Sequence, residues 1–473
     1  MSRSRSPRER VSAAAEMPIR RLTSGISGGS VCAQAVQGAG IGAGLFGDSE
    51  KINITGGAVV AGSSSGGAGI GGGVRGGIFT SGGSAKEINI SDASVIAAAS
   101  NLSKKSEFDR LIEHGGEAAR AAADDLIRNF SDDISISDVF LLYKDFIFYF
   151  FNSSSFECFG TGIGAGARGH AGTIRITNSN VTAEGGVQSA GIGSSKENSF
   201  DAVQIVNSTV SAKGGENGAG IGSGCQSSGN GSVTISGSKV TADGGNYAAG
   251  IGTGKKSPKP ACTININNRS DITAKGGMYG AGIGGGCEVG GGTVTIADSD
   301  VNAYGGNDAA GIGGGEDGNG GHIEICDHAN VYAKGNHYGA GIGGGENGDG
   351  EYCAIEGTCT VEAQAGSSGT RIAIGYGDHR IFTSYTQGTV ALGNAMLVKA
   401  GFLGSNTDVY AGSERFRALS IYDYVKLYPC RHSTTVWKYD TTSLHVRYCT
   451  ECGVRLGDQT EEHNWNSENI CTE

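Results

Sequence analysis

Proline and long apolar runs are scarce in this chain, and each shortage excludes a class of protein. Only 5 of the 473 residues are proline, and the glycines do not fall at every third position, so a collagen triple helix is excluded. The one strongly apolar run, at 139–151, contains Lys144 and Asp145. It is too short and too charged to cross a bilayer, so we expect no transmembrane segment.

Positive charge is also in deficit. The chain has 36 Lys and Arg against 47 Asp and Glu, and its formal net charge of −11 argues against nucleic acid as the main partner. Residues 1–24 are rich in arginine and serine, but they lack the apolar core of a secretory signal. We expect this segment to be a disordered basic N-terminus.

Glycine, in contrast, is abundant, with 86 residues, about two and a half times the usual share. Much of it lies in one motif, Gly-Ala-Gly-Ile-Gly-Gly-Gly, which is complete at Gly67–Gly73, Gly280–Gly286 and Gly339–Gly345. The central isoleucine recurs every 29 to 32 residues at Ile163, Ile192, Ile221, Ile251, Ile283, Ile312 and Ile342. A fixed period of this length is typical of a repeat architecture.

Each repeat predicts three short strands. In the unit 293–314, small or apolar residues alternate with polar ones three times, which indicates strands with one buried face. These residues are Val294 and Ile296, then Ser299, Val301 and Ala303, then Ala310, Ile312 and Gly314. Gly-Gly pairs between the strands suit corners that need a positive φ. No unit can bury its apolar residues alone, so the units must stack as coils of parallel strands. One internal column is expected to contain Val181, Val210, Val240, Ile272, Val301 and Val331.

The repeat array is predicted to occupy residues 25–404. One interval between motifs is about three times as long as the others, which indicates an insertion at 101–159, helical in its first half and aromatic in its second. This insertion either packs on the flank of the coils or forms a flap that binds a partner. Residues 405–428 are expected to form a cap, and 429–473 a small Cys/His-rich module.

The C-terminal module carries the strongest chemical signal. Cys449 and Cys452 form a Cys-x-x-Cys-Gly turn, which aims two thiolates at one ion. Cys430 and His432 complete a tetrahedral set for structural zinc, with His445 as the alternative ligand. The module has too few apolar side chains for a core and so needs a staple. A disulfide with a leftover histidine, or a disordered tail, are the alternatives.

A second candidate site is the turn before each Gly-Ile-Gly. Tyrosines stacked along a rigid coil, with amides beside them, suit the apolar face and the hydroxyls of a sugar ring. The residues of this carbohydrate-binding prediction are Asn246, Tyr247, Tyr279, Asn307, Asp308 and Tyr338. The alternative is ordinary loop decoration.

A third candidate site is acidic. Glu316 and Asp317 lie one period before Glu346 and Asp349, and oxygen ligands on adjacent coils could hold calcium. Acidic residues, asparagine and glycine are equally what tight turns favour. The sequence gives no comparable signal for catalysis, which would need acids or a base converging in one cleft. The outward positions of the first strand do not form such a set: Arg175, Gln204, Thr234, Asn265, Thr295 and Glu324.

The repeat Gly-x-[Ile/Val]-x-Ile…Ser-x-Val-x-Ala-x-Gly-Gly…Ala-Gly-Ile-Gly-Gly-Gly resembles the glycine-rich tandem repeats of bacterial cell-surface proteins with a pectin-lyase-like, right-handed parallel β-helix. It is also similar to the carbohydrate-binding β-helix proteins of anaerobic, plant-fibre-degrading Gram-positive bacteria. The tail resembles the Cys-x-His…Trp…His…Cys-x-x-Cys-Gly…His-x-Trp modules at the ends of such surface proteins.

The resemblance implies an all-β, right-handed parallel β-helix at a cell surface or outside the cell. It implies a non-catalytic, adhesin-like or polysaccharide-binding function, with a polysaccharide or a host or cell-surface glycan as partner. Two alternatives stay open: a polysaccharide lyase or glycoside hydrolase of the pectin-lyase-like fold, and a structural spacer without a ligand.

Overall fold

The structure is a computed structural model that describes residues 22–462 with several gaps. These gaps are 36–37, 45–46, 65, 75–82, 101–109, 111–112, 114–158, 229–230, 258–260, 370–371, 379–385, 394–395, 403–408, 413–420 and 440–443. Residues 1–21 of the predicted disordered segment at 1–24 lie outside the described residues. The remaining three residues belong to the first strand, which begins at Leu22. Most of the predicted insertion at 101–159 also lies outside them.

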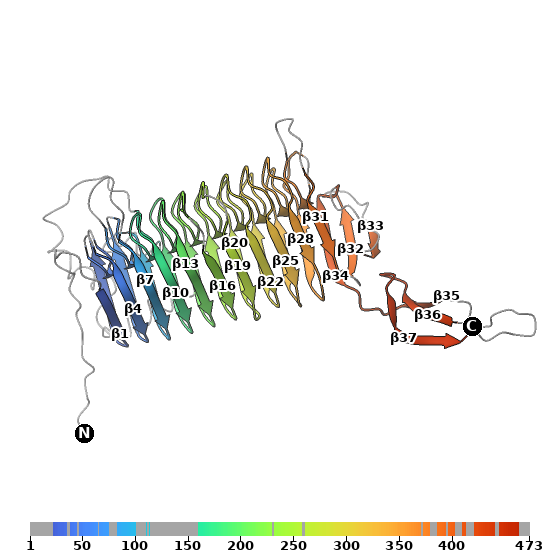
Figure 1. Ribbon diagram of the computed structural model, residues 1–473, viewed down its shortest axis with the longest axis horizontal. Coiled ribbons are helices and arrows are strands. Elements are labelled where there is room, and N and C mark those ends of the chain that lie inside the picture. The colour runs from blue at the N-terminus through green and yellow to red at the C-terminus, as the bar shows by residue number, and fades with distance from the viewer. Residues whose placement is uncertain are drawn as a thin grey trace, which may run out of the picture.

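Stacked coils form a parallel β-solenoid, and each coil gives one strand to each of three sheets (Figure 1). Sheet A comprises β1 (Leu22–Ser27), β4 (Ser49–Thr55), β7 (Ala85–Ser91), β10 (Ala171–Thr177), β13 (Phe200–Val206), β16 (Ser232–Ser236), β19 (Thr263–Asn267), β22 (Thr293–Ala297), β25 (His322–Cys326), β28 (Tyr352–Ile355) and β31 (Thr389–Leu392).

Sheet B continues each coil after a corner. Its parallel strands are β2 (Ser30–Ala35), β5 (Ala58–Ser63), β8 (Ser94–Ala98), β11 (Asn180–Glu184), β14 (Thr209–Lys213), β17 (Lys239–Asp243), β20 (Asp271–Lys275), β23 (Asp300–Tyr304), β26 (Asn330–Lys334) and β29 (Thr360–Gln364). The two-residue strands of sheet C are β3 (Ile41–Gly42), β6 (Ile70–Gly71), β9 (Ile163–Gly164), β12 (Ile192–Gly193), β15 (Ile221–Gly222), β18 (Ile251–Gly252), β21 (Ile283–Gly284), β24 (Ile312–Gly313), β27 (Ile342–Gly343) and β30 (Ile374–Gly375).

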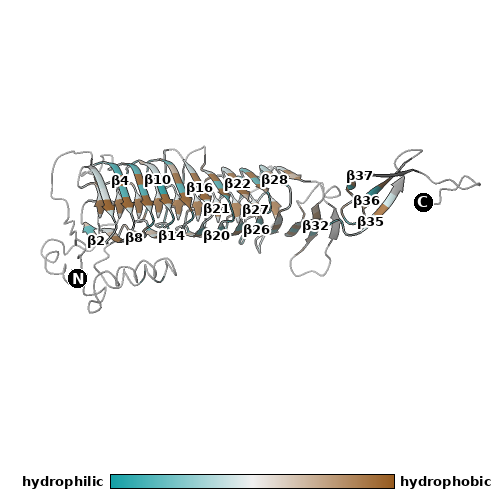
Figure 2. Cartoon of the chain, turned by 90° about the horizontal axis from the view of Figure 1, so that it is seen from below, coloured by the Kyte–Doolittle hydropathy of each residue, from teal (hydrophilic) through white to brown (hydrophobic). Residues whose placement is uncertain are grey.

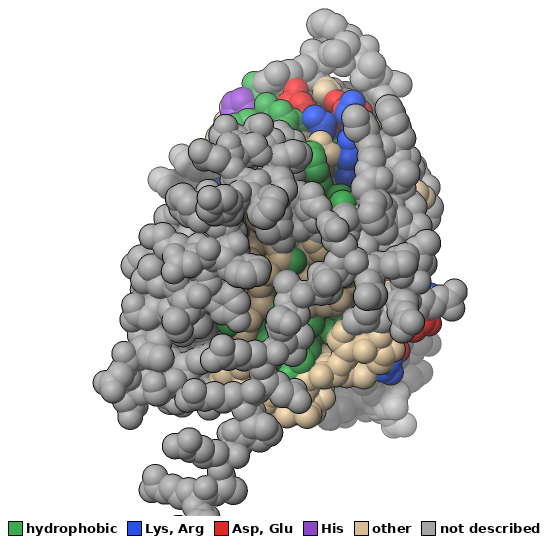
Figure 3. Space-filling view, turned by 90° about the vertical axis from the view of Figure 1, so that its left-hand side faces the viewer, with side chains coloured by type: hydrophobic (Ala, Val, Ile, Leu, Met, Phe, Trp, Pro, Cys, Tyr) green, Lys and Arg blue, Asp and Glu red, His purple; other side chains and the backbone are tan. Residues whose placement is uncertain are grey.

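The interior consists of apolar columns that run along the stack. The predicted column from Val181 to Val331 is confirmed, because each of its members pairs with the next and is at most 2% exposed. The isoleucines of sheet C add a hydrophobic stripe on the narrow side of the coil (Figure 2). Hydrophobic side chains are also visible where the stack is viewed from its N-terminal end (Figure 3). The period-two pattern of the sequence therefore corresponds to one continuous core.

Glycine is required where sheet C passes closest to its neighbours. Gly222 has a φ of 133°. A Cβ atom there would overlap the carbonyl oxygen of Gly252 in the next coil. The Gly after each isoleucine therefore has two physical reasons, a backbone conformation that other residues rarely adopt and the lack of space for a side chain.

Serine has its own role at the corner between sheets A and B. The Ser208 hydroxyl donates to the carbonyl of Val206 at 2.7 Å and accepts the backbone N–H of Ser179 at 3.1 Å. Ser238 accepts the N–H of Ser208 in the same way, and the ladder continues to Ser270. Each serine thus satisfies a buried amide that the turn leaves without a strand partner.

The insertion leaves the solenoid between β8 and β9. Within it the structure describes Arg110 and Glu113, which are helical, and Phe159 at its end. Arg110 forms an ion pair of 2.7 Å with Glu184 on β11. On the same outward side of sheet B, Val60 and Ile96 are only 1% and 0% exposed.

The C-terminal end closes with antiparallel strands. β34 (Tyr424–Pro429) pairs with β29 and with β32 (Met396–Gly401), and β33 (Val409–Gly412) pairs with β32. The alternation of the sequence predicts that β32 belongs to the repeat array, which we expect to end at 404. In the structure β32 instead pairs antiparallel with β33 and β34 and so belongs to the cap. Beyond the cap, β35 (Thr435–Tyr439), β36 (Leu444–Cys449) and β37 (Arg455–Glu462) form a small antiparallel sheet.

Replacing Val240 with Asp is expected to unfold the coils on either side of it. The side chain is 1% exposed and stacked between Val210 and Ile272, so a carboxylate there would be buried without a partner, at a cost of several kcal/mol. Thermal unfolding followed by circular dichroism measures the effect. Thr241→Asp, the outward neighbour on the same strand, is the matched control. Equal stability of the two variants would contradict the internal position of Val240.

Candidate functional sites

Two columns of turn residues lie side by side over the outer side of sheet C. The backbone N–H of Cys287 donates to the carbonyl of Tyr247 at 2.9 Å. In the following coils Glu316 donates to Tyr279 and Glu346 donates to Asp308 in the same way, at 3.1 and 2.8 Å. We call this surface the turn face. Its members are Tyr247, Tyr279, Asp308 and Tyr338 in one column and Lys255, Cys287, Glu316 and Glu346 in the other.

Two of the predicted tyrosines stack on each other. The rings of Tyr247 and Tyr279 are 5.1 Å apart and inclined by 22°. The Lys255 ammonium lies over the Tyr247 ring, 3.7 Å from its centre. Tyr247 therefore has two close partners, the Tyr279 ring and the Lys255 ammonium. On the other face of Tyr279, no aromatic ring stacks among the described residues.

Tyr338 is separated from this pair by one coil, which carries Asp308. His337 contacts the Tyr338 ring edge-on at 3.9 Å, and its Nδ1 lies 3.3 Å from the Asp308 carboxylate. The predicted amides lie in the neighbouring column, where Asn307 accepts a hydrogen bond of 3.2 Å from Asn336 and Asn246 is exposed. The structure thus brings all six predicted sugar-site residues to one surface, although their rings do not form one continuous stack.

The acidic residues converge differently from the sequence prediction. Carboxylate oxygens of Asp308, Glu316 and Glu346 all lie within 4.8 Å of one another. The Asp317 and Asp349 carboxylates instead accept hydrogen bonds from the side-chain amide of Asn347 and the backbone N–H of Thr386. Asp308 joins the cluster through its backbone bond with Glu346, a contact between turns that the spacing of the acids does not reveal.

The three carboxyl groups share a partly dry environment. Glu346 is only 4% exposed. Burial, followed by the charges of Asp317 and Asp308, raises the pKa of Glu316, although a hydrogen bond with Cys287 opposes this shift. A divalent cation would relieve the repulsion among these groups, so the cluster is chemically suited to one.

The Cys/His cluster lies at the junction between the cap and the small C-terminal sheet. Cys430 follows β34, whereas Cys449 ends β36 and Cys452 lies on the turn before β37. Ligand atoms of these cysteines and of His432 all lie within 4.8 Å of one another, as the sequence predicts. The side chain of His445, the predicted alternative ligand, lies outside the described residues.

The distances within the cluster fit a metal better than a disulfide. The Cys430 and Cys449 sulfurs are 3.4 Å apart, and the Cys452 sulfur is 3.4 Å from His432 Nδ1. A disulfide requires about 2.05 Å, whereas a tetrahedron with bonds of about 2.3 Å separates its sulfurs by about 3.8 Å. Burial raises the pKa of Cys449, but hydrogen bonds from Cys452, His432 and Cys430 outweigh it and lower the pKa to about 6. Burial raises the pKa of the Cys430 thiol to about 12 and also raises the pKa of Cys452, so one of the three thiols favours the thiolate form before a metal binds.

A Ser–His–Asp chain on the rim of sheet A was not foreseen from the sequence. His170 Nδ1 lies 3.0 Å from Ser199 Oγ, and its Nε2 lies 3.2 Å from Asp201. The Asp201 side chain is 65% exposed, and the backbone N–H of Ser199 is already bound to Asn198. Without a buried carboxylate or a free N–H beside the hydroxyl, this chain is a hydrogen-bonded link between coils and not a catalytic triad.

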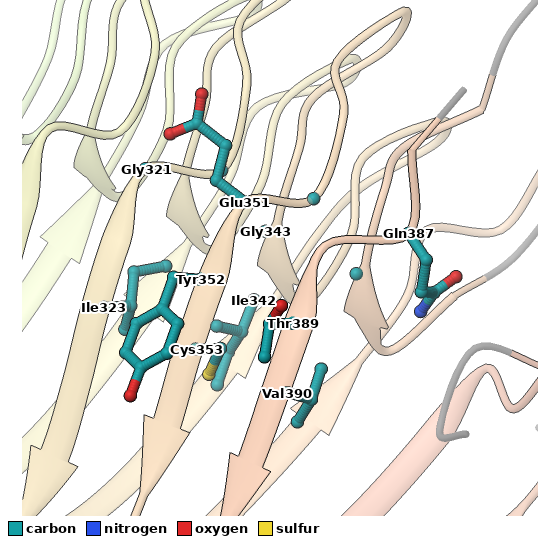
Figure 4. A pocket seen from close by; sticks show the side chains of 13 residues that line it. Gly321, Ile323, Ile342, Gly343, Glu351, Tyr352, Cys353, Gln387, Thr389 and Val390 are labelled. Atoms are coloured by element: carbon teal, nitrogen blue, oxygen red, sulfur yellow. The ribbon is translucent and has the colours of Figure 1, made fainter. Parts of the chain in front are cut away.

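A hollow near the C-terminal end of the stack lies between β25, β28 and β31 (Figure 4). It is lined mainly by glycine and by interior side chains such as Ile323, Ile342 and Cys353. The Gln387 side chain lies against Gly375, at the end of sheet C. The hollow is therefore the closing end of the core, and it offers no set of converging polar groups to a ligand.

Comparison with known proteins supports the architecture. A family model described as a beta helix repeat matches residues 174–196, 203–225, 233–255, 264–287, 291–316 and 323–346. Each matched segment covers one coil through its three sheets. A search of curated proteins and a search of solved structures each gave no match.

The repeats and the stacked sheets together show that the chain has a parallel β-helix repeat fold, with a Cys/His cluster near its C-terminus. Within the part of the chain that the structure describes, no helix has the length and apolar character needed to cross a membrane.

Proposed function

We propose that the protein binds a polysaccharide or another glycan on the turn face. The observation that carries the proposal is the Tyr247–Tyr279 stack, which holds the two rings rigid and leaves one face of Tyr279 without an aromatic partner. An aromatic face of this kind suits the apolar side of a sugar ring. A rigid site also lowers the entropic cost of binding.

Polar groups around Tyr279 suit the hydroxyls of the same sugar. Asp308 follows in the next coil, and Asn246 and Asn307 lie in the adjoining column. Tyr338 lies two coils from Tyr279, about 10 Å away at the usual spacing of strands. A sugar ring between them would contact one tyrosine and hydrogen-bond to Asp308.

The setting of this function is a second part of the proposal. Glycan binding by a long, rigid solenoid suits an adhesin-like protein at a cell surface or outside the cell. The resemblance of the repeats to those of bacterial surface proteins supports this setting. Polysaccharide cleavage is the alternative, because Asp308 and Glu316 are converging acids and the pKa of Glu316 is raised.

We propose zinc as the metal of the Cys/His cluster. Three cysteines and one histidine are a ligand set that zinc favours in structural sites, and they would leave no open coordination position. Because the ligands come from both the cap and the small sheet, zinc would fix one to the other. Leu397 of β32 packs against the same cluster.

We propose calcium, bound weakly, for the carboxylate cluster of the turn face. The proposed ligands are Asp308, Glu316 and Glu346, because among the described acidic residues of the turn face these three converge. Two residues of the predicted set, Asp317 and Asp349, are therefore not among the ligands. Oxygen ligands from adjacent coils are what this ion prefers.

Glycan-array binding of the full-length protein tests the main proposal. Tyr279→Ala should weaken binding of the recognised glycan about tenfold, since ring stacking contributes about 1 kcal/mol beyond the buried area. Tyr279→Phe should retain most of the affinity. Tyr304→Ala, which removes an outward tyrosine of sheet B, is the matched control.

Two results of this experiment would count against glycan binding by the turn face. The first is an array without any bound glycan, and the second is equal binding by the Tyr279→Ala and wild-type proteins. Release of reducing ends from the bound glycan, assayed in parallel, would favour the cleavage alternative.

Elemental analysis under reducing conditions should find close to one zinc per chain. A chelator should then loosen the C-terminal sheet while the solenoid keeps its β signal in circular dichroism. Cys449→Ser should lower the zinc content, whereas Cys326→Ser, at a free cysteine outside the cluster, should not. Purified protein without metal, in which Cys449 and Cys452 are freely alkylated, would disprove the zinc site.

Calcium should raise the thermal unfolding temperature of the wild-type protein. Glu316→Gln should abolish most of this increase, because it removes one charged ligand from the cluster. Asp317→Asn should leave most of the increase intact, since that carboxylate is not one of the three that converge and instead accepts a hydrogen bond from Asn347. An increase of the same size in both variants would place the ion elsewhere.

A further inference from the structure

The outward side of sheet A changes character along the stack. At its N-terminal end the side chains pair with one another, for example Lys51 with Glu87 at 3.1 Å and Asn89 with Asn53 at 2.9 Å. At its C-terminal end His322 pairs with Glu324 at 2.9 Å and stacks on Tyr352. Between these ends, three successive strands carry only uncharged side chains at their outward positions, and those at the first two outward positions are all polar.

These side chains form two columns on β16, β19 and β22, which we call the neutral face. The strand register aligns Ser232, Thr263 and Thr293 in one column and Thr234, Asn265 and Thr295 in the other. All six are exposed or partly exposed. None of their side chains has a hydrogen bond to another described residue. The hydroxyl or amide groups of these six side chains are thus free to bond to solvent. At both ends of the sheet, in contrast, outward side chains pair with one another.

The neutral face is also rigid. Neighbouring members of a column lie about 4.8 Å apart, and the two columns about 6.6 Å apart, because every strand is fixed by parallel pairing on both sides. Threonine, which supplies four of the six side chains, has restricted χ1 rotamers. A ligand that hydrogen-bonds here would therefore order few groups of the protein.

The chemistry of the neutral face selects one kind of partner. Hydroxyl and amide groups both donate and accept hydrogen bonds, as the hydroxyls of a sugar do. Because none of the six side chains is charged, the neutral face has no cation to pair with an anionic polysaccharide or a nucleic acid. Three coils by five residues give an area of roughly 230 Å², well below the ~800 Å² that each partner buries in a stable protein–protein interface. A short stretch of an uncharged glycan fits both the chemistry and the size.

We propose that the neutral face of sheet A is a binding site for an uncharged oligosaccharide, whose hydroxyl groups pair with Thr234, Asn265, Thr295 and their neighbours. The site is on a different side of the coil from the turn face. It does not depend on the tyrosines there.

Calorimetric titration of the full-length protein with cellohexaose, mannohexaose and xylohexaose tests this site, with hexagalacturonate as the anionic comparison. At least one neutral hexasaccharide should bind, and more tightly than hexagalacturonate. Combined Thr234→Val and Thr295→Val should weaken binding at least tenfold, because valine keeps the shape and removes the hydroxyl. Asn265→Asp should also weaken it, since it adds a charge.

The matched control is the combined Thr241→Val and Thr273→Val variant, on the outward side of sheet B, which should bind like the wild-type protein. Circular dichroism checks that every variant is folded. Absence of binding by all three neutral hexasaccharides, or equal binding by the sheet A variant and the control, would overturn the proposal. So would tighter binding of hexagalacturonate.

The Tyr279→Ala variant, titrated alongside, separates this site from the turn face. If only Tyr279→Ala weakens binding, the turn-face proposal stands and the neutral face is not a site. If only the sheet A variants weaken binding, the neutral face stands and the turn face has no part in binding these sugars.

Discussion

Hydrogen bonding between successive coils is the interaction on which the rest of this structure depends. In the regular coils from β13 to β27, each strand finds its backbone partners in the coils before and after it, about 30 residues away in the sequence. The spacing of the repeats along the sequence must therefore stay nearly constant in these coils. Glycine, which has no side chain, is needed wherever two coils approach each other most closely. Gly222 meets this requirement in sheet C, and the buried serines satisfy the amides that the corners leave over. The constant spacing of the repeats and the glycine in each of them follow from these two requirements.

The same stacking creates the candidate sites. A residue at one position of the repeat is placed about 4.8 Å from its counterparts in the neighbouring coils, so each position of the repeat becomes a column on the surface. Tyr247 and Tyr279 become a stacked pair in this way, and Thr263 and Thr293 become neighbours on a flat sheet. Small changes between repeats then set local chemistry, from the tyrosines to the acids of the turn face. A solenoid can thus change its surface coil by coil while its core stays the same.

The C-terminal end follows a different physical rule. An antiparallel strand, β34, stops the parallel stacking by pairing with β29. Among the described side chains of the small sheet beyond it, Val446 is buried whereas Val436 and Trp437 are exposed, and the Cys/His cluster lies where the cap and this sheet meet. A metal at that point would join the cap to this sheet.

The sequence by itself determined the coils, their three strands and the inward positions, because burial of one strand face leaves a period of two and stacking leaves a period of about 30. It also identified Cys430, His432, Cys449 and Cys452 as a group, since Cys-x-x-Cys is a local geometry. Only the tertiary structure showed that Asp308 joins Glu316 and Glu346 while Asp317 and Asp349 do not, and that β32 belongs to the cap. It alone revealed which outward threonines lack partners. These facts depend on side-chain directions and on contacts between separate turns. Neither of these produces a repeating pattern in the sequence that could be recognised.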